Sequence, residues 1–210
     1  MMISPETFYE NEIKGKTPEQ IMSVVRSLKR EISKQKKDLE NDTFDKNIIC
    51  PSPATRISCS REYLKIAIEA LGEQYTPTRG EIKAAEFQKK IPAIVKATFD
   101  IGGYFYGQTV VEATIGPDAI SFEHFNIQYP GKEEEDLGFE KEDWLSELER
   151  LYIGEWKKHY VDIEVLDGTQ WGLRFDYDDG SFVEYDGSNA YPYNFEDLAY
   201  LFGVCMRDEE

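Results

Sequence analysis

Hydrophobic and polar residues alternate most regularly near the C-terminal end of the chain. Between residues 169 and 177 every second side chain is large and apolar, and the positions between them are polar residues or glycine. An alternation of period two predicts a strand with one face buried and the other face in water. The apolar face of this strand consists of Trp171, Leu173, Phe175 and Tyr177.

A tight turn should connect this strand to a second one. Asp178-Asp179-Gly180 is a turn sequence, and its glycine can adopt the left-handed conformation that a three-residue hairpin loop needs at its last position. With this loop Phe175 faces Val183, and Arg174 faces Glu184 on the opposite side of the hairpin. A two-residue loop would place Phe175 opposite Glu184 and mix the two faces. We therefore predict the three-residue loop.

Similar patterns elsewhere predict an α+β fold. An antiparallel sheet of about five strands would contain residues 93–101, 108–115, 119–126, 169–177 and 181–186. Helices are indicated after the caps Thr17 and Thr78 and over 60–71, 140–152 and 194–202, the last of them capped by Asn194. The segments 1–16, 41–58 and 129–139 have the composition of loops. The helices should cover one face of the sheet.

The loop that contains Pro51 and Pro53 suggests a division of the chain. We expect an N-terminal helical segment and linker over 1–58 and an α+β domain over 59–210, with one continuous domain as the alternative. No apolar run approaches the length of a membrane span, and the N-terminus lacks the features of a signal peptide. The three cysteines, an odd number without metal-type spacing, fit a reducing compartment. These features predict a cytoplasmic protein that does not associate with membranes.

The charge of the chain is unevenly distributed. The net charge is −17, and residues 131–210 contain 7 Lys and Arg against 23 Asp and Glu, whereas residues 1–130 contain 17 against 18. An acidic half repels the phosphates of nucleic acids, so we do not expect it to bind DNA or RNA. A basic stripe follows the first long helix and could be a solvated face, a contact for an anionic partner or a docking surface for the acidic half. It consists of Arg26, Lys29, Arg30, Lys36 and Lys37.

Sequence motifs for catalysis are absent. His124 and His159 are not accompanied by a nucleophile motif, and residues 102–107 match no phosphate-binding loop. The acidic turn at 176–184 has the wrong spacing for a calcium loop, and zinc would need clusters of Cys and His. We therefore expect neither a metal nor a cofactor, and we assign no catalytic residue.

Two segments rich in aromatic rings are candidate binding surfaces. The first lies between Gly102 and Gly107, and the second follows the last strand from Gly187 onward. Tyr and Trp are common anchors of protein interfaces, although the same rings could instead cover the core. The candidate binding residues are Tyr104, Tyr106, Trp171, Ser188, Asn189, Tyr191 and Tyr193.

Several short stretches, each present once and spread in order over nearly the full length of the chain, carry a resemblance to other proteins. They include SPETFYEN, TPEQIMSVVRSLKREI, IGGYFYG, IGEW, LDGTQW and GSNAYPYNF. Together they resemble a widespread family of uncharacterised bacterial proteins. The resemblance implies an intracellular bacterial protein, and it transfers no activity, cofactor or catalytic residue.

Two functional hypotheses follow from these observations. The first is a non-enzymatic protein-binding or adaptor module that uses an acidic, aromatic C-terminal surface. The second is a carboxylate-dependent hydrolase with a site near 187–193, in which Asp167 and Asp186 would act beside Trp171 and Tyr191. The sequence identifies neither a particular protein partner nor an oligomeric state.

Overall fold

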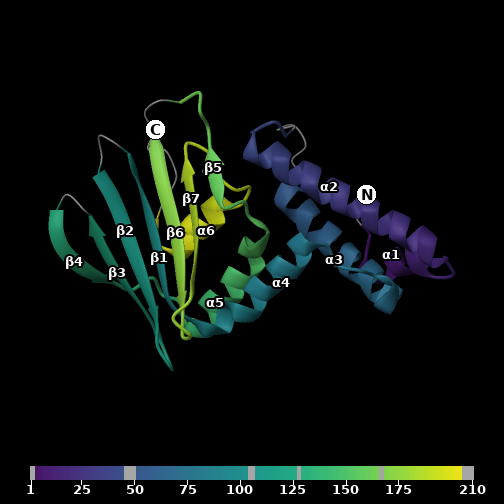
Figure 1. Ribbon diagram of the computed structural model, residues 1–210, viewed down its shortest axis with the longest axis horizontal. Coiled ribbons are helices and arrows are strands. Elements are labelled where there is room, and N and C mark those ends of the chain that lie inside the picture. The colour runs from purple at the N-terminus through teal and green to yellow at the C-terminus, as the bar shows by residue number, and fades with distance from the viewer. Residues whose placement is uncertain (1–2, 45–50, 104–106, 127–128, 166–167, 205–210) are drawn as a thin grey trace. The chain divides into compact units, whose positions relative to one another are not determined.

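The computed structural model describes the chain except for residues 1–2, 45–50, 104–106, 127–128, 166–167 and 205–210 (Figure 1). The chain forms two compact units, Met1–Thr78 and Arg79–Glu210. The predicted division after residue 58 falls inside a single helix of the first unit, α3 (Pro53–Leu71). The loop was predicted too long because Ser52 caps this helix through a hydrogen bond from the Thr55 backbone N–H. Pro53 then occupies the first turn, where a missing N–H is tolerated.

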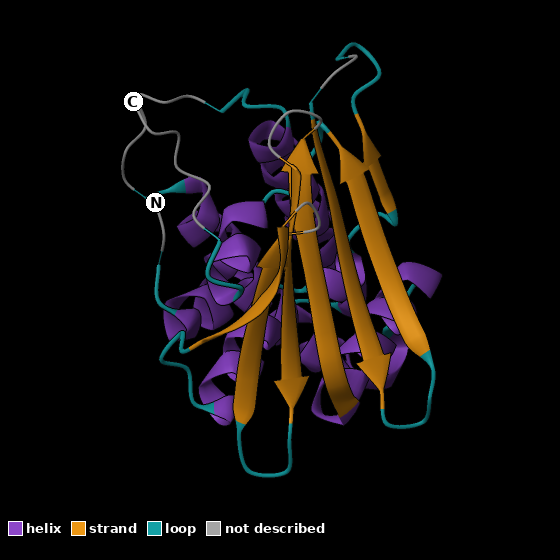
Figure 2. Ribbon diagram, turned by 90° about the vertical axis from the view of Figure 1, so that its left-hand side faces the viewer, coloured by secondary structure: helices purple, strands orange, loops and turns teal. Residues whose placement is uncertain are grey.

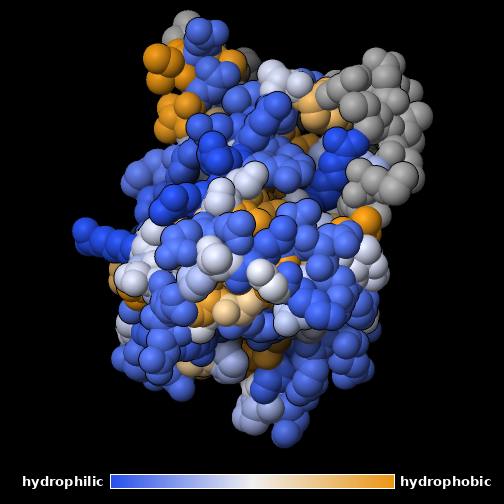
Figure 3. Space-filling view, turned by 90° about the vertical axis from the view of Figure 1, so that its right-hand side faces the viewer, coloured by the Kyte–Doolittle hydropathy of each residue, from blue (hydrophilic) through white to orange (hydrophobic). Residues whose placement is uncertain are grey.

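The first unit is built on α3 and a longer helix, α2 (Pro18–Glu40). The predicted cap at Thr17 is confirmed and forms a capping box, because the Thr17 backbone N–H donates to Gln20 Oε1 at 2.9 Å and the Gln20 N–H donates to Thr17 Oγ1 at 3.4 Å. Before α2, the predicted loop contains a short helix, α1 (Pro5–Phe8), and a π-helical turn (Tyr9–Ile13). The core of this unit consists of Phe8, Ile13, Ile21, Val25, Leu28, Ala67 and Leu71. The one face of the molecule that Figure 3 shows is mainly hydrophilic.

The second unit contains a seven-stranded sheet, with α4 (Arg79–Lys90), α5 (Lys141–Arg150) and α6 (Phe195–Leu201) packed against it. The strands lie in the order β4-β3-β2-β1-β6-β7-β5. Their bounds are β1 (Ile94–Gly103), β2 (Gly107–Ile115), β3 (Ile120–Asn126), β4 (Tyr129–Glu135), β5 (His159–Val161), β6 (Thr169–Tyr177) and β7 (Phe182–Ser188). The predicted α+β class is confirmed.

The prediction of about five strands in an antiparallel sheet is wrong in two respects. The sheet has two further strands, β4 and β5, and it is mixed because β5 pairs in parallel with β7. Both missed strands lie at the edges of the sheet, where a strand needs no long apolar alternation. The strand β4 contains a proline, a glycine and three glutamates, a composition that reads as a loop in the sequence.

The hairpin of β6 and β7 has the predicted register. Phe175 pairs with Val183, and Arg174 pairs with Glu184. Gly180 has a φ of +77°, and its N–H donates to the Tyr177 carbonyl oxygen at 3.0 Å, which closes the loop. The structure therefore confirms the left-handed glycine that both faces of the hairpin require.

One face of the sheet carries the core of the second unit. Figure 2 shows the helices behind the strands, and no helix in the described part of this unit covers the front face. The covered face holds the odd-numbered residues of β6 and, beyond the irregularity at Ile94–Lys96, those of β1 from Ala97 on; Phe99 and Phe175 among them are fully buried. Phe99 packs on Phe202 beyond the end of α6, and Phe175 packs on Phe87 of α4. The helices thereby seal the apolar side of each strand.

Candidate functional site

The predicted binding residue Trp171 lies in the core. Its side chain is 2% exposed, and its indole N–H donates to the Ala190 carbonyl oxygen at 2.9 Å. The ring packs against Trp156, Tyr160 and Phe195 with centroid distances of 4.9–6.3 Å. A ring that is buried and hydrogen-bonded within the fold has no surface to offer a partner. Trp171 therefore packs in the core among side chains of the C-terminal elements.

The segment after β7 holds its shape through local hydrogen bonds. Asn189 is left-handed, with a φ of +55°, and its side-chain amide donates to the Val165 carbonyl oxygen at 3.3 Å. The backbone N–H of Asn189 donates to the Thr169 carbonyl oxygen at 2.9 Å. The Ser188 hydroxyl accepts from Gln170 Nε2 at 2.7 Å. These amide and hydroxyl groups already have partners within the chain.

The two tyrosines of the same segment lie half-buried beside the start of α6. The Tyr191 ring packs on Phe195 at a centroid distance of 4.8 Å, whereas Tyr193 lies one residue before Asn194. Asn194 precedes α6 as predicted, but its side chain makes no capping hydrogen bond. It accepts instead from Trp156 Nε1 at 3.2 Å and donates to the Leu151 carbonyl oxygen at 2.9 Å.

The residues of the hydrolase hypothesis do not come together in the described part of the chain. Tyr104, Tyr106 and Asp167 lie outside the described residues. Asp186 projects from the outer face of the sheet, where both its carboxylate oxygens lie within 3.0 Å of His159 Nδ1. Trp171 projects from the covered face. The acid and the ring that the hydrolase hypothesis combines therefore lie on opposite sides of one sheet.

The helices α5 and α6 carry part of the acidic charge of the second unit. Asp197 is exposed on α6, yet partial desolvation raises the pKa of its carboxyl above the usual value, assisted by the charges of Glu196 and Glu147. Glu147 also accepts a hydrogen bond from Arg150 at 2.6 Å, an exposed pair one helical turn apart. We call the surface formed by Glu147, Glu196, Asp197 and Tyr200 the α5–α6 acidic face. Its carboxylates repel one another in the free protein.

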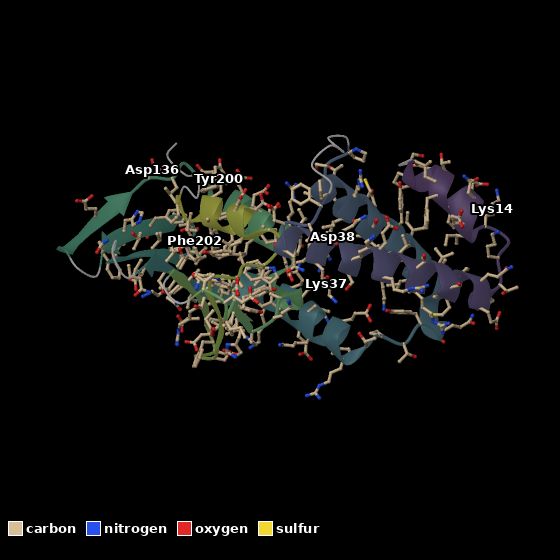
Figure 4. The ribbon with its side chains drawn as sticks, turned by 90° about the horizontal axis from the view of Figure 1, so that it is seen from above. Lys14, Lys37, Asp38, Asp136, Tyr200 and Phe202 are labelled. Carbon is tan, nitrogen blue, oxygen red and sulfur yellow. The ribbon has the colours of Figure 1, made fainter. Side chains whose placement is uncertain are left out.

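An aromatic ring stands beside these carboxylates. The Tyr200 side chain is 71% exposed, although its inner edge meets the Phe139 ring at a centroid distance of 6.0 Å. Phe202, two residues later, is fully buried against the sheet. Figure 4 shows Tyr200 and Phe202 on different sides of the chain at this point. The sequence signal for Tyr200 was its position off the apolar stripe of α6, and sequence reasoning did not single it out.

The two units differ sharply in net charge. Residues 1–78 contain 12 Lys and Arg against 12 Asp and Glu, whereas residues 79–210 contain 12 against 29. The whole net charge of −17 therefore belongs to the second unit. This field would attract positively charged molecules to the second unit and repel polyanions.

Two further observations limit the chemistry of the described residues. Within them, no group of three or more His, Cys, Asp or Glu side chains is placed to hold a metal ion. A search of the same residues finds no helix with the length and apolarity that crossing a membrane requires. Cys59, the one cysteine that the described ranges show as a free thiol, is half-buried in α3.

Comparisons of the chain with protein-family models, with curated proteins and with solved structures find no match. The resemblance to a bacterial family thus stays a prediction, and function has to be inferred from the geometry of the chain itself.

Proposed function

We propose that this chain is a non-enzymatic protein-binding or adaptor module and that its α5–α6 acidic face binds a basic segment of a partner protein. The observation that carries this proposal is that the side chains of Glu196, Asp197 and Tyr200 are all exposed within about one turn of α6, and that partial desolvation and the charges of Glu196 and Glu147 raise the pKa of Asp197. A carboxylate with a purely structural role would usually lie beside a cation. The charges that shift the pKa of Asp197 are instead those of two other carboxylates, Glu196 and Glu147.

A partner cation would remove this electrostatic cost. A Lys or Arg side chain placed between Asp197 and Glu196 gains two attractive interactions and screens the repulsion between the carboxylates. Repulsion that is present in the free protein and relieved in a complex makes binding more favourable. The arrangement therefore favours a basic protein segment over a neutral one.

Tyr200 supplies the apolar part of the same surface. Tyrosine buries a large ring at a small cost in conformational entropy, and it is enriched among residues that dominate binding energy. Its ring is exposed next to the carboxylates of α6, so an arginine could stack on it while pairing with Asp197. This combination supports a protein partner over a nucleic acid, whose phosphates the acidic face would repel.

The test is site-specific photo-crosslinking in cells of the source organism. The photoreactive phenylalanine analogue p-benzoylphenylalanine replaces Tyr200 in one variant and Tyr9 in a matched control. Tyr9 is also an exposed tyrosine, but it lies in the unit with balanced charge. We expect a recurring crosslinked protein from position 200 that is absent from position 9, and the crosslinked peptide should be basic.

Charge reversal distinguishes specific binding at this surface from non-specific binding. Glu196→Lys should reduce the crosslinking yield at position 200 several-fold in cells. When the crosslinking is repeated in a cell lysate, salt at about 0.5 M should do the same because it screens charge pairs beyond a few ångströms. Identical crosslinked products from positions 9 and 200, or a yield that neither change affects, would refute the proposed function.

A further inference from the structure

A cavity of about 510 Å³ opens between α4 and the hairpin of β6 and β7. Figure 1 shows the C-terminal end of α4 beside the turn that connects these two strands. Lys90 joins the two elements, because its Nζ donates to Asp179 Oδ2 at 3.1 Å and to Ser181 Oγ at 3.0 Å. Cavities of small-molecule sites typically measure about 300–1,000 Å³. This cavity is separate from the α5–α6 acidic face and contains none of its residues.

The walls of the cavity are aromatic and aliphatic. Phe87 of α4 meets the rings of Phe175 and Tyr185 edge-on at centroid distances of 5.6 and 6.3 Å. Tyr177 and Val183 complete the apolar lining on the hairpin side. Gly154 lets α4 approach, since a Cβ there would lie 2.8 Å from the Phe87 Cβ. The site can therefore enclose an apolar ring or a short chain.

The rim of the cavity is basic within a strongly acidic unit. Lys83, Lys89 and Lys90 of α4 line it, against Glu86 as the acid among the lining residues. Lys158 lies close by, with its Nζ 4.2 Å from the centroid of the Tyr185 ring. Burial lowers the pKa of Lys158, the charge of Lys83 lowers it further, and the Glu184 carboxylate acts in the opposite direction. Lys158 Nζ also donates to the Glu184 carbonyl oxygen at 2.8 Å, which leaves other N–H groups for a ligand. Two ammonium groups that repel each other beside an apolar cavity are suited to hold an anion between them.

Two tyrosine hydroxyls complete the polar lining. The Tyr185 side chain is 2% exposed, and neither its hydroxyl nor that of Tyr177 has a hydrogen-bond partner among the residues that the structure describes. Burial raises the pKa of Tyr177 to about 12 and that of Tyr185 further still, so both phenols stay protonated donors at neutral pH. Neither hydroxyl is among the fully buried atoms without a partner, which in the described residues are Gln35 Oε1 and Gln88 Oε1, so both keep access to solvent and can donate to a ligand oxygen.

We propose that this cavity binds a small organic anion, an apolar ring or short chain that carries a carboxylate. The apolar body occupies the space between Phe87, Val183 and the two tyrosines. The carboxylate lies at the rim, where Lys83 and Lys158 neutralise it and the phenol hydroxyls donate hydrogen bonds to it. This assigns the second unit a ligand site that is independent of the proposed protein-binding face.

The test compares two probes of the same shape in the full-length chain. Isothermal titration calorimetry measures the binding of 2-naphthoate, which carries a carboxylate, and of 2-naphthamide, its neutral counterpart. We expect saturable binding of one naphthoate per chain. The amide should bind at least about tenfold more weakly, because it is neutral and forms no ion pair with the lysines.

Charge variants locate the binding at the rim. Lys83→Glu should weaken naphthoate binding on the order of fivefold, the effect of a unit charge a few ångströms away in a partly hydrated site. Glu86→Lys should strengthen it by a similar factor, which a loss of folding cannot imitate. Lys141→Glu on α5 is the matched control, since it makes the same charge change outside the cavity lining, and it should leave the affinity within about twofold.

Three outcomes would overturn the proposal. The first is an absence of saturable naphthoate binding up to millimolar concentrations. The second is equal binding of naphthoate and naphthamide, which would show that the lysines do not recognise the anion. The third is a response to Lys141→Glu as large as the response to Lys83→Glu, which would reduce the effect to the net charge of the protein.

Discussion

Replacing Gly187 with alanine probes the packing around Trp171, on which the C-terminal elements depend. A Cβ at position 187 would overlap the indole nitrogen of Trp171 and would lie 2.7 Å from its Cζ2. The ring would have to shift, and it would then lose its hydrogen bond to the Ala190 carbonyl oxygen. Overpacking costs about 1–3 kcal/mol, and a lost hydrogen bond costs about 0.5–1.5 kcal/mol.

A partial compensation has to be subtracted from this cost. Alanine is favoured over glycine inside a strand by about 0.5–1 kcal/mol, because glycine loses more backbone entropy on folding. The expected net effect of Gly187→Ala is therefore a loss of about 2 kcal/mol in the free energy of unfolding. A loss of this size is well above the error of a denaturation experiment.

Urea unfolding followed by tryptophan fluorescence is a suitable assay. The chain has 3 tryptophans, Trp144, Trp156 and Trp171, and all of them lie in the second unit. The signal therefore reports on the unit that contains Gly187. Gly103→Ala is the matched control, since its Cβ would lie 3.5 Å from the nearest atom, an ordinary contact. Equal unfolding midpoints for the two variants would refute the argument that the Trp171 ring requires glycine at position 187.

Two further predictions concern the contact of α4 and the turn of the hairpin. Gly154→Ala should destabilise the second unit by about 1–3 kcal/mol, because its Cβ would lie 2.8 Å from the Phe87 Cβ and 2.9 Å from the Ala84 Cα. The fluorescence assay measures this loss, and an unchanged unfolding midpoint would contradict the prediction. Hydrogen bonds from the Ser181 hydroxyl and N–H, and from Lys90, lower the pKa of Asp179 to about 2. Because the folded-state pKa is lowered, the ionised carboxylate stabilises the fold above pH 4 or so, and this contribution is lost as the pH falls toward 2. Asp179→Asn should thus lower the unfolding midpoint at pH 6 and make no difference near pH 2, whereas a pH-independent difference would contradict this assignment.

The sequence predicted the hairpin well because two constraints agreed there. The alternation of residues 169–177 fixed the buried face, and the left-handed glycine at position 180 fixed the register. A one-residue slip would have turned every ring of the strand toward water, so few alternatives were compatible. The capping box at Thr17 was predictable for a similar reason, since it depends on residues three positions apart.

The edge strands could not be predicted from the same signals. Neither β4 nor β5 has a strict apolar face, and the parallel pairing of His159 with Asp186 joins segments far apart in the sequence. Such pairing is decided by the tertiary fold, which places β4 and β5 against the two opposite edges of the sheet. The mixed sheet thus follows from contacts that no local pattern specifies.

The candidate site shows the limit of composition as a guide. Aromatic residues near Gly187 suggested a surface, yet Trp171 is buried and hydrogen-bonded because the strand alternation points it inward. The charge asymmetry was a better guide, because it located the acidic residues in the second unit. Tyr200 could have been identified as the ring on the polar side of α6, where helical spacing separates it from Leu198 and Leu201.

The most direct test of the proposed function is the yield of the protein crosslinked from position 200 when Asp197 is replaced by asparagine. Since the pKa of Asp197 is raised in the folded state, ionisation of this carboxyl costs stability as the pH rises, and Asp197→Asn should increase the unfolding midpoint at pH 7. The same variant removes a charge that a basic partner needs. The account predicts a more stable protein with a markedly lower crosslinking yield. An unchanged yield from a protein of equal or greater stability would contradict it.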